Sequence, residues 1–190
     1  MLKDLILKNR SYRRFCQSER ITESQLTEWI DLARNSASAR NAQPLKYILS
    51  TDETMNARIF ENLAWAGYLT DWPGPEEGER PAAYIVMLHD TLISPNYLCD
   101  DGIAAQSILL GATESGFGGC MIYSVNRAGL SELLNLPGHL KIIQVLALGK
   151  PKEVVVLEEM KNGEVKYWRD ENQVHHVPKR SLQEIIVRMC

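Results

Sequence analysis

Residues 97–120, YLCDDGIAAQSILLGATESGFGGC, decide the fold of this chain. Asp100 and Asp101 begin a predicted helix, because acidic side chains cap an N-terminus and carry the negative charge that a first helical turn favours. The helical pattern ends at a group of glycines, Gly116, Gly118 and Gly119. Between these ends the residues are apolar or small on nearly every face of the helix: Ile103, Ala104, Ala105, Ile108, Leu109, Leu110 and Ala112.

A helix that is apolar all round cannot lie on a protein surface. It is either the central helix of a domain or a helix at a subunit interface, where small residues permit close approach. A membrane span is the remaining apolar interpretation, but the run is too short and is interrupted by Asp100, Gln106 and Glu114. We therefore expect a buried helix and leave open whether a second subunit helps to bury it.

The composition is that of an ordinary globular protein, with 45% hydrophobic and 24% charged residues. The 190 residues suit a single domain, 1–190, or one subunit of an oligomer with a shared core. A net charge of −3 argues against general nucleic-acid binding. Residues 1–10 lack the long apolar region of an export signal, and the cysteines lack CxxC spacing, so we expect a cytoplasmic protein with reduced thiols.

Helical and strand patterns alternate along most of the chain. Thr22 and Gln25 form a predicted capping box for a helix that runs through Ala33. Further helices are predicted at 53–69, 128–134 and 182–187. Strands are predicted at 45–49, 84–88, 121–125 and 142–148, and a hairpin at 154–160 and 165–168 around the turn Asn162-Gly163. The pattern predicts an α+β fold, with a central mixed β-sheet flanked by helices.

Familiar catalytic signatures are missing from the sequence. There is no GxSxG, HExxH, P-loop or EF-hand motif. The glycines of residues 116–119 follow a helix, whereas a dinucleotide fingerprint must precede one. His175 and His176 are adjacent, so their side chains diverge, and we predict no metal site.

Two basic clusters stand near opposite ends of the chain. The first contains Arg10, Arg13 and Arg14, and the second contains Lys179 and Arg180. Both could be solvated surface charge. Alternatively, the fold joins them around a phosphate, which needs several donors in fixed positions, such as Arg forks and a neighbouring hydroxyl.

Two loops are candidates for ligand contacts. Residues 35–44 are small and polar, and Ser38 and Asn41 there could either read a polar ring edge or form local turns. Residues 71–78, with Trp72 and the nearby Tyr68, could form a lid over a substrate. They could equally be an exposed connection with one packed Trp.

Four stretches taken together resemble the FMN-dependent nitroreductase family. That family has an Arg-Arg-Ser-x-Arg-x-Phe motif, which reads NRSYRRF at 9–15, and a Pro-Ser-x-x-Asn-x-Gln-Pro-Trp motif, which reads ASARNAQPL at 37–45. An Asp-x-Gly-x-Ala-x-Gln-x-x-x-Leu helix running into Gly-x-Gly corresponds to 100–119. Leu-Gly-x-Pro corresponds to 148–151, and a distal Pro-Lys-Arg to 178–180. Each motif alone is weak, but their order and spacing are specific.

The resemblance implies a homodimer with two FMN sites at its interface, in which residues from about 151 to 190 extend onto the partner. It assigns the ribityl phosphate to Arg10, Ser11, Arg13, Lys179 and Arg180. It places Ala37, Ser38, Ala39 and Asn41 against the flavin of the partner subunit. It lines the isoalloxazine with Ile122, Tyr123 and Ser124, partly through backbone groups.

The chain departs from the family pattern at a few positions: Asn9 replaces the first Arg, Ala37 the Pro, Leu45 the Trp, and Lys150 a common Tyr. None of these removes the phosphate cluster. The first changes one phosphate contact, and Ala37 and Leu45 alter the shape of the pocket.

The implied activity is hydride transfer from NADH or NADPH through bound FMN to a nitroaromatic, quinone or similar acceptor. The cofactor carries the chemistry, which agrees with the absence of a triad or acid–base pair, and we name no catalytic residue. Arg13 and Arg180 are candidates for the cation that stabilises the reduced ring. The alternatives are other flavin chemistry on the same scaffold, such as a dehalogenase, a dehydrogenase or a flavin-consuming enzyme, and a flavin-binding protein without turnover.

Overall fold

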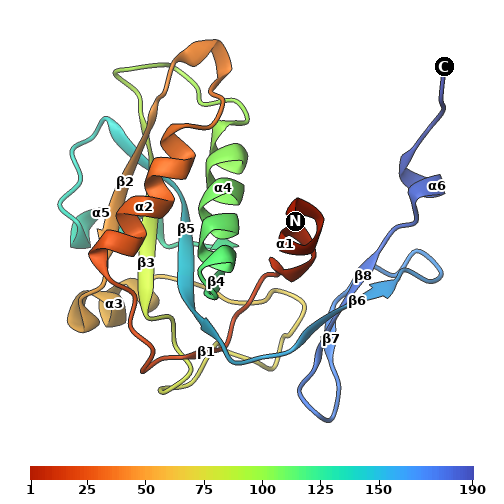
Figure 1. Ribbon diagram of the computed structural model, residues 1–190. Helices are drawn as coiled ribbons and strands as arrows, with labels where there is room; N and C mark the ends of the chain where they lie inside the picture. The colour runs from red at the N-terminus through yellow and green to blue at the C-terminus, as the bar shows by residue number, and fades with distance from the viewer.

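The computed structural model describes residues 1–190 and divides into a sheet-and-helix body and a C-terminal arm (Figure 1). The body contains a five-stranded sheet whose strands run β1-β5-β3-β2, with β4 also paired to β5. These strands are β1 (Phe15–Cys16), β2 (Leu45–Ser50), β3 (Ala83–Asp90), β4 (Gly118–Ile122) and β5 (Leu140–Pro151). All of these strand pairs are antiparallel, so the parallel pairing expected of a mixed sheet is confined here to an isolated bridge between Ser11 and Gly119.

Helices cover both faces of the sheet. α2 (Glu23–Arg34) and α4 (Asp100–Glu114) pack on one face, in front of the sheet in Figure 1. α3 (Glu53–Phe60) and α5 (Arg127–Leu133) pack on the other. Because alternate residues of β3 and β5 point to opposite faces, the two strands contribute to both cores and are buried along almost their whole length. The continuous apolar runs that predicted buried strands at 84–88 and 142–148 are confirmed.

The predicted central helix is α4, and its ends explain its limits. At the C-terminus, Phe117 N donates to Ala112 O at 2.8 Å and Gly116 N donates to Thr113 O at 3.0 Å, with Gly116 at φ +78°. This is a Schellman motif, which requires a left-handed residue and favours glycine. At the N-terminus the cap residue is Cys99, so the expectation that Asp100 caps the helix is wrong. The Asp100 carboxylate is buried and bonds elsewhere.

α2 begins as the sequence predicts. The Thr22 side chain accepts a hydrogen bond from Gln25 N, and the Gln25 side chain accepts one from Thr22 N. This reciprocal capping box satisfies two donors that a helix start leaves free. Leu26, Trp29 and Ala33 are buried on the face that packs against α4.

The helix predicted over 53–69 is wrong beyond Phe60, where α3 ends. Leu63 forms a β-bridge with Val125, and Ala64 N donates to Ser124 O at 2.9 Å. These backbone groups pair with the chain after β4 and so cannot continue a helix. Ala66, at φ +40°, then turns the chain away.

The strand predicted over 121–125 also has the wrong start, because β4 already begins at Gly118 and ends at Ile122. The glycines that end the helical pattern thus belong to the sheet. A Cβ at Gly119 would stand 2.3 Å from Ala147 O on β5, so only glycine permits this approach of β4 to β5. Two different glycines therefore have different roles: Gly116 ends the helix, and Gly119 permits the close approach of β4 to β5.

The C-terminal arm holds a three-stranded sheet, made of β6 (Val155–Glu159), β8 (His175–Lys179) and β7 (Trp168–Arg169) in that order. The predicted hairpin of 154–160 with 165–168 is wrong, because β6 pairs in parallel with β8 and β7 pairs antiparallel with β8. The turn itself forms: Asn162 and Gly163 have φ of +53° and +73°, and Glu164 N donates to Lys161 O at 2.9 Å. β8 lies between β6 and β7, so those two strands do not pair with each other.

The arm ends in α6 (Leu182–Ile185), shorter than the predicted helix 182–187, and leads the C-terminus away from the body (Figure 1). α1 (Leu2–Lys8) lies between α4 and the arm, and a short 3₁₀ turn, η1 (Ala39–Asn41), follows α2. None of the helices combines the length and the apolar character needed to cross a membrane.

Candidate functional site

Segments from both ends of the chain meet beside α4 in a cavity of about 240 Å³. We call it the basic cavity. Its walls are residues that follow α1, the middle of α4, strand β4, and strands β6 and β8 of the arm: Asn9, Arg10, Ser11, Gln106, Leu109, Gly119, Met121, Val155, Val177 and Lys179. The fold therefore joins one member of each basic cluster, Arg10 and Lys179, in one place.

Arg10 is held in this cavity by the end of α1. Its Nη2 donates to Ile6 O at 2.7 Å, whereas its Nε is buried without a partner. Ser11 is exposed, and its backbone bridges to Gly119 of β4. Lys179 is the last residue of β8, two positions after Val177, so both side chains point to the cavity face of that strand.

Arg180 lies outside the basic cavity, although it follows Lys179 directly. Its Nη1 donates to Glu184 of α6 at 2.7 Å, and half of its side chain is exposed. Neighbouring residues in extended chain point to opposite sides, which is why Lys179 and Arg180 separate.

A second cavity, of about 160 Å³, lies at the other end of β4. We call it the β4-end cavity. Met121 lines both cavities. The remaining walls come from the turn after α3, the chain around the end of β4, and the arm: Arg13, Ala64, Trp65, Ala66, Gly67, Cys120, Ile122, Tyr123, Ser124 and Tyr167. Ile122, Tyr123 and Ser124, predicted together from the sequence, thus share one cavity.

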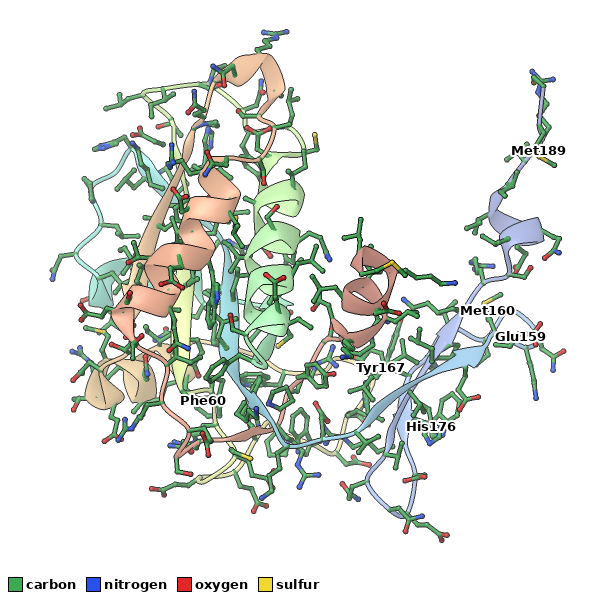
Figure 2. The ribbon with its side chains drawn as sticks, viewed as in Figure 1. Phe60, Glu159, Met160, Tyr167, His176 and Met189 are labelled. Atoms are coloured by element: carbon green, nitrogen blue, oxygen red, sulfur yellow. The ribbon has the colours of Figure 1, made fainter.

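Arg13 points to the β4-end cavity, away from the Arg10 and Lys179 pair. Its guanidinium lies 5.0 Å from the ring centre of Tyr167, and its Nη1 donates to Ser11 O at 3.3 Å. The same nitrogen lies 3.4 Å from Nε2 of His175. In Figure 2, Tyr167 marks the place where the arm meets the body.

Three titratable groups near this cavity, Cys120, Tyr123 and His175, are neutral at pH 7. Burial raises the pKa of the Cys120 thiol to about 12. Partial burial and the hydrogen bond from its hydroxyl to Asp101, at 2.7 Å, raise the pKa of Tyr123 to about 12. Burial, with Arg13 and Arg169 nearby, lowers the pKa of His175 to about 4. Arg13 is therefore the charged side chain among the residues that line the cavity.

The loop of residues 35–44 contacts the N-terminal end of α4. Ser38 Oγ donates to Asp100 Oδ2 at 2.6 Å, and Ala39 N donates to Asp100 Oδ1 at 2.8 Å. Asn41 accepts from the Gln43 amide at 3.2 Å. Neither Ala37 nor these loop residues line the basic or the β4-end cavity of their own chain.

Residues 71–78 pack against the body and the arm. Trp72 is half-buried in the core beside α3, and the guanidinium of Arg169 lies 4.1 Å from its ring centre. Gly74 and Pro75 are buried. Trp72 lines neither cavity, and this packing favours the connection over the lid.

Comparison with known proteins gives a consistent result. Residues 95–150, which include α4, β4 and most of β5, match the family described as "Nitroreductase family". A nitroreductase family protein from Clostridium novyi NT is 26% identical, with 80% of this chain and 87% of that chain covered and a TM-score of 0.66. The chain is similar to members of the nitroreductase family.

Two further proteins that resemble this chain differ in how closely they match. The nitroreductase family protein from Streptococcus pneumoniae TIGR4 is 14% identical, covers 100% of both chains and has a TM-score of 0.71, which shows a shared fold. The iodotyrosine deiodinase of Thermotoga neapolitana is 24% identical over 170 residues, which is 80% of this chain and 90% of that protein.

Several residues that line the two cavities are not predicted from the sequence. Residues 64–67 fall within the predicted helix 53–69, although Gly67 indicates an interruption of the helix. Tyr167 was placed in a hairpin strand, and nothing in the sequence shows that the arm folds back onto Arg13. Val155 and Val177 line the same cavity because β6 and β8 pair in parallel, with Val155 opposite His175 and Val177 two residues further along β8, and no local pattern predicts that pairing.

The donors present in the basic cavity suit a flavin phosphate. The basic cavity offers a guanidinium with a buried unpartnered Nε, a lysine ammonium and a serine hydroxyl, which is a donor set for a phosphate. Apolar side chains and a single cation line the adjoining β4-end cavity, which suits a ring with one polar edge. The residues present therefore fit the group.

Proposed function

We propose that this protein is an FMN-dependent oxidoreductase that passes hydride from NADH or NADPH to a nitroaromatic, a quinone or a similar small acceptor. The observation that carries the proposal is the meeting of Arg10, Ser11 and Lys179 in one cavity that adjoins a second, largely apolar one. When bound, FMN would supply the redox chemistry, which protein side chains lack.

The phosphate of FMN belongs in the basic cavity. Arg10 and Lys179 bring two positive charges, which match the charge of a phosphate, and the Ser11 hydroxyl adds a neutral donor. Arg180 is not part of this set, because Glu184 already neutralises it outside the cavity.

The ring of FMN belongs in the β4-end cavity, beside Ile122, Tyr123 and Ser124. Negative charge that develops on one edge of a ring during reduction is stabilised by a fixed cation in a poorly hydrated site. Arg13 lines this cavity, so we assign it to the ring and not to the phosphate. Arg13→Gln should lower the midpoint potential of the bound flavin, whereas Arg13→Lys, which keeps the charge, should leave it nearly unchanged. An equal shift in both variants would dismiss the assignment.

A second copy of the chain would complete the site. Ser38 and Ala39 contact Asp100 at the N-terminal end of α4 and line neither cavity of their own chain, which supports their contacting a flavin in a partner subunit. The arm also exposes many apolar side chains, which a monomer would leave in water: Val154, Leu157, Leu182, Ile185, Ile186, Val187 and Met189. We propose a cytoplasmic homodimer in which residues from about 151 to 190 extend onto the partner, without nucleic-acid or membrane partners.

The direct test is to purify the protein, record its visible spectrum and identify the flavin released on denaturation. We expect FMN, bleaching under anaerobic NADH or NADPH, and recovery of the oxidised spectrum when an acceptor is added. A protein that stays colourless after incubation with excess FMN would refute the cofactor. Bound FMN that neither nucleotide reduces would indicate a flavin-binding protein without turnover.

The acceptor panel should include 3-iodotyrosine beside nitroaromatics and quinones. The similarity to the iodotyrosine deiodinase of Thermotoga neapolitana is the observation that puts a halogenated substrate on the panel. Release of iodide faster than reduction of every nitroaromatic and quinone would favour the alternative of dehalogenation on the same scaffold.

A further inference from the structure

A third cavity, of about 290 Å³, lies beside α3 on the face of the sheet that α3 and α5 cover. We call it the α3 cavity. None of its lining residues lines the basic or the β4-end cavity. Its walls come from the chain after β1, from α3, from the segment before β3 and from the start of β3. Phe60, labelled in Figure 2, belongs to its lining at the end of α3.

Tyr84 of β3 lines this cavity and has an unsatisfied hydroxyl. The residue is 1% exposed, and its hydroxyl has no hydrogen-bond partner. Burial raises the pKa of Tyr84, so the group remains a protonated donor at every physiological pH. A buried hydroxyl without a partner costs free energy, which indicates that something outside the chain satisfies it.

The neighbouring polar side chain cannot be that partner. Asn56 of α3 is buried, its Nδ2 donates to Ala82 O at 2.9 Å, and its Oδ1 accepts from Ser50 Oγ at 2.7 Å. Both ends of this amide are therefore engaged within the fold. Asn56 is thus fully hydrogen-bonded within the fold, whereas the hydroxyl of Tyr84 is not.

Arg80 supplies a second unsatisfied donor. Its guanidinium lies 4.3 Å from the ring centre of Phe60, and its backbone N donates to Gln17 at 3.1 Å, so the residue is held in place. Its Nε is buried without a partner, and no carboxylate forms an ion pair with it. A guanidinium fixed in this way is prepared for an anion.

The other charges of the cavity limit which anion can enter. Arg20 forms an ion pair with Glu53 and so is already neutralised. Glu77 is exposed on the lining and repels a multiply charged group. Arg80 is the one lining cation that no carboxylate pairs with, which suits a singly charged ligand.

We propose that the α3 cavity binds a small monocarboxylate, whose carboxylate accepts hydrogen bonds from the Arg80 guanidinium and the Tyr84 hydroxyl. A planar carboxylate matches the fork of a guanidinium, and it carries the single charge that the cavity allows. The site is independent of the proposed cofactor function, because it shares no lining residue with the two cavities beside β4.

The test is isothermal titration of the full-length protein with benzoate, with the neutral isostere benzamide and with inorganic phosphate in separate experiments. We expect benzoate to bind at least about ten times more tightly than benzamide, and phosphate not to bind in this cavity. Tyr84→Phe and Arg80→Gln should each weaken benzoate binding about tenfold or more. Arg58→Gln is the control, because Arg58 is an exposed cation of α3 that does not line the cavity.

Several outcomes would overturn the proposal. No binding of benzoate would mean that water alone satisfies Tyr84 and Arg80. Benzoate binding that survives in both variants would place the ligand elsewhere, including the cavities beside β4. Phosphate binding that Arg80→Gln abolishes would show that the class of anion is wrong. Circular dichroism spectra that match the wild type would confirm that Tyr84→Phe and Arg80→Gln are folded.

Discussion

Glu153→Gln should weaken the attachment of the arm to the body and so lower the free energy of unfolding. The Glu153 side chain is fully buried where β5 leaves the sheet. Its Oε1 accepts from the backbone N–H groups of Arg13 and Arg14, and its Oε2 accepts from Arg169 Nη2 at 2.9 Å. A single carboxylate therefore connects the chain before β1 with strand β7 of the arm.

The substitution keeps the shape of the side chain but reverses one hydrogen bond. A glutamine can place its oxygen toward the two backbone N–H groups, and its NH₂ then faces Arg169, where donor meets donor. Arg169 is 9% exposed and its Nε already lacks a partner, so the guanidinium becomes a buried charge without compensation. Breaking a buried ion pair in this way costs about 3–5 kcal/mol. For a chain of 190 residues that is a fall in Tm of roughly 6–20 °C.

Urea unfolding followed by far-UV circular dichroism measures the free energy of unfolding, and Glu158→Gln provides the control. Glu158 contacts His176 in the same arm, but 41% of its side chain is exposed, so its loss should cost less than about 1 kcal/mol. A loss below about 1 kcal/mol for Glu153→Gln, or equal losses in the two variants, would show that the carboxylate does not hold the arm.

Further outcomes are expected at the cofactor cavity, at a buried histidine and at a glycine. Arg10→Ala should weaken FMN binding about 10- to 150-fold, and Arg180→Ala should change it little, as measured by quenching of flavin fluorescence, with riboflavin as the ligand that lacks the phosphate. Because the folded-state pKa of His175 is lowered to about 4 from its ordinary 6.5, the unfolded chain binds more protons between these values. Stability should therefore be fully present above pH 6.5 and fall by up to about 3 kcal/mol toward pH 4, and His175→Gln should remove this slope from urea unfolding curves. Gly119→Ala should destabilise the protein by about 1–3 kcal/mol or more, because the added Cβ meets a carbonyl of β5, whereas Gly138→Ala, with open space, should stay within about 0.5 kcal/mol.

The elements that are predicted correctly are determined by residues within the element itself. The capping box of α2 and the apolar run of β3 need no distant partner to be recognised. Where distant partners decide, prediction failed: residues 63–64 leave the helix to pair with the chain after β4. The turn at Asn162-Gly163 forms as predicted, yet its flanks do not pair with each other. The reason is that β6 pairs with β8, which comes later in the sequence.

Asp100 shows how a correct pattern can receive the wrong explanation. An acidic residue in a first helical turn predicts a cap, and the helix does start there. The buried carboxylate instead bonds Ser38 and the backbone of Ala39, so it fixes the loop of residues 35–44 against α4. Substitution of Asp100 would therefore disturb that loop before it disturbed the helix.

The division of the second basic cluster could have been predicted from periodicity, once residues 175–179 were recognised as a strand. Successive side chains of a strand alternate, so Val177 and Lys179 share a face and Arg180 belongs to the other. What periodicity cannot supply is the partner of that strand. The parallel pairing of β8 with β6 brings Val177 and Lys179 into the same cavity as Val155 and Arg10. One wall of the basic cavity is thus made by a pairing between segments about twenty residues apart in the arm, while the other walls come from the chain after α1, from α4 and from β4. Any change that separates β6 from β8 should therefore remove Lys179 from the cavity while Arg10 stays in place.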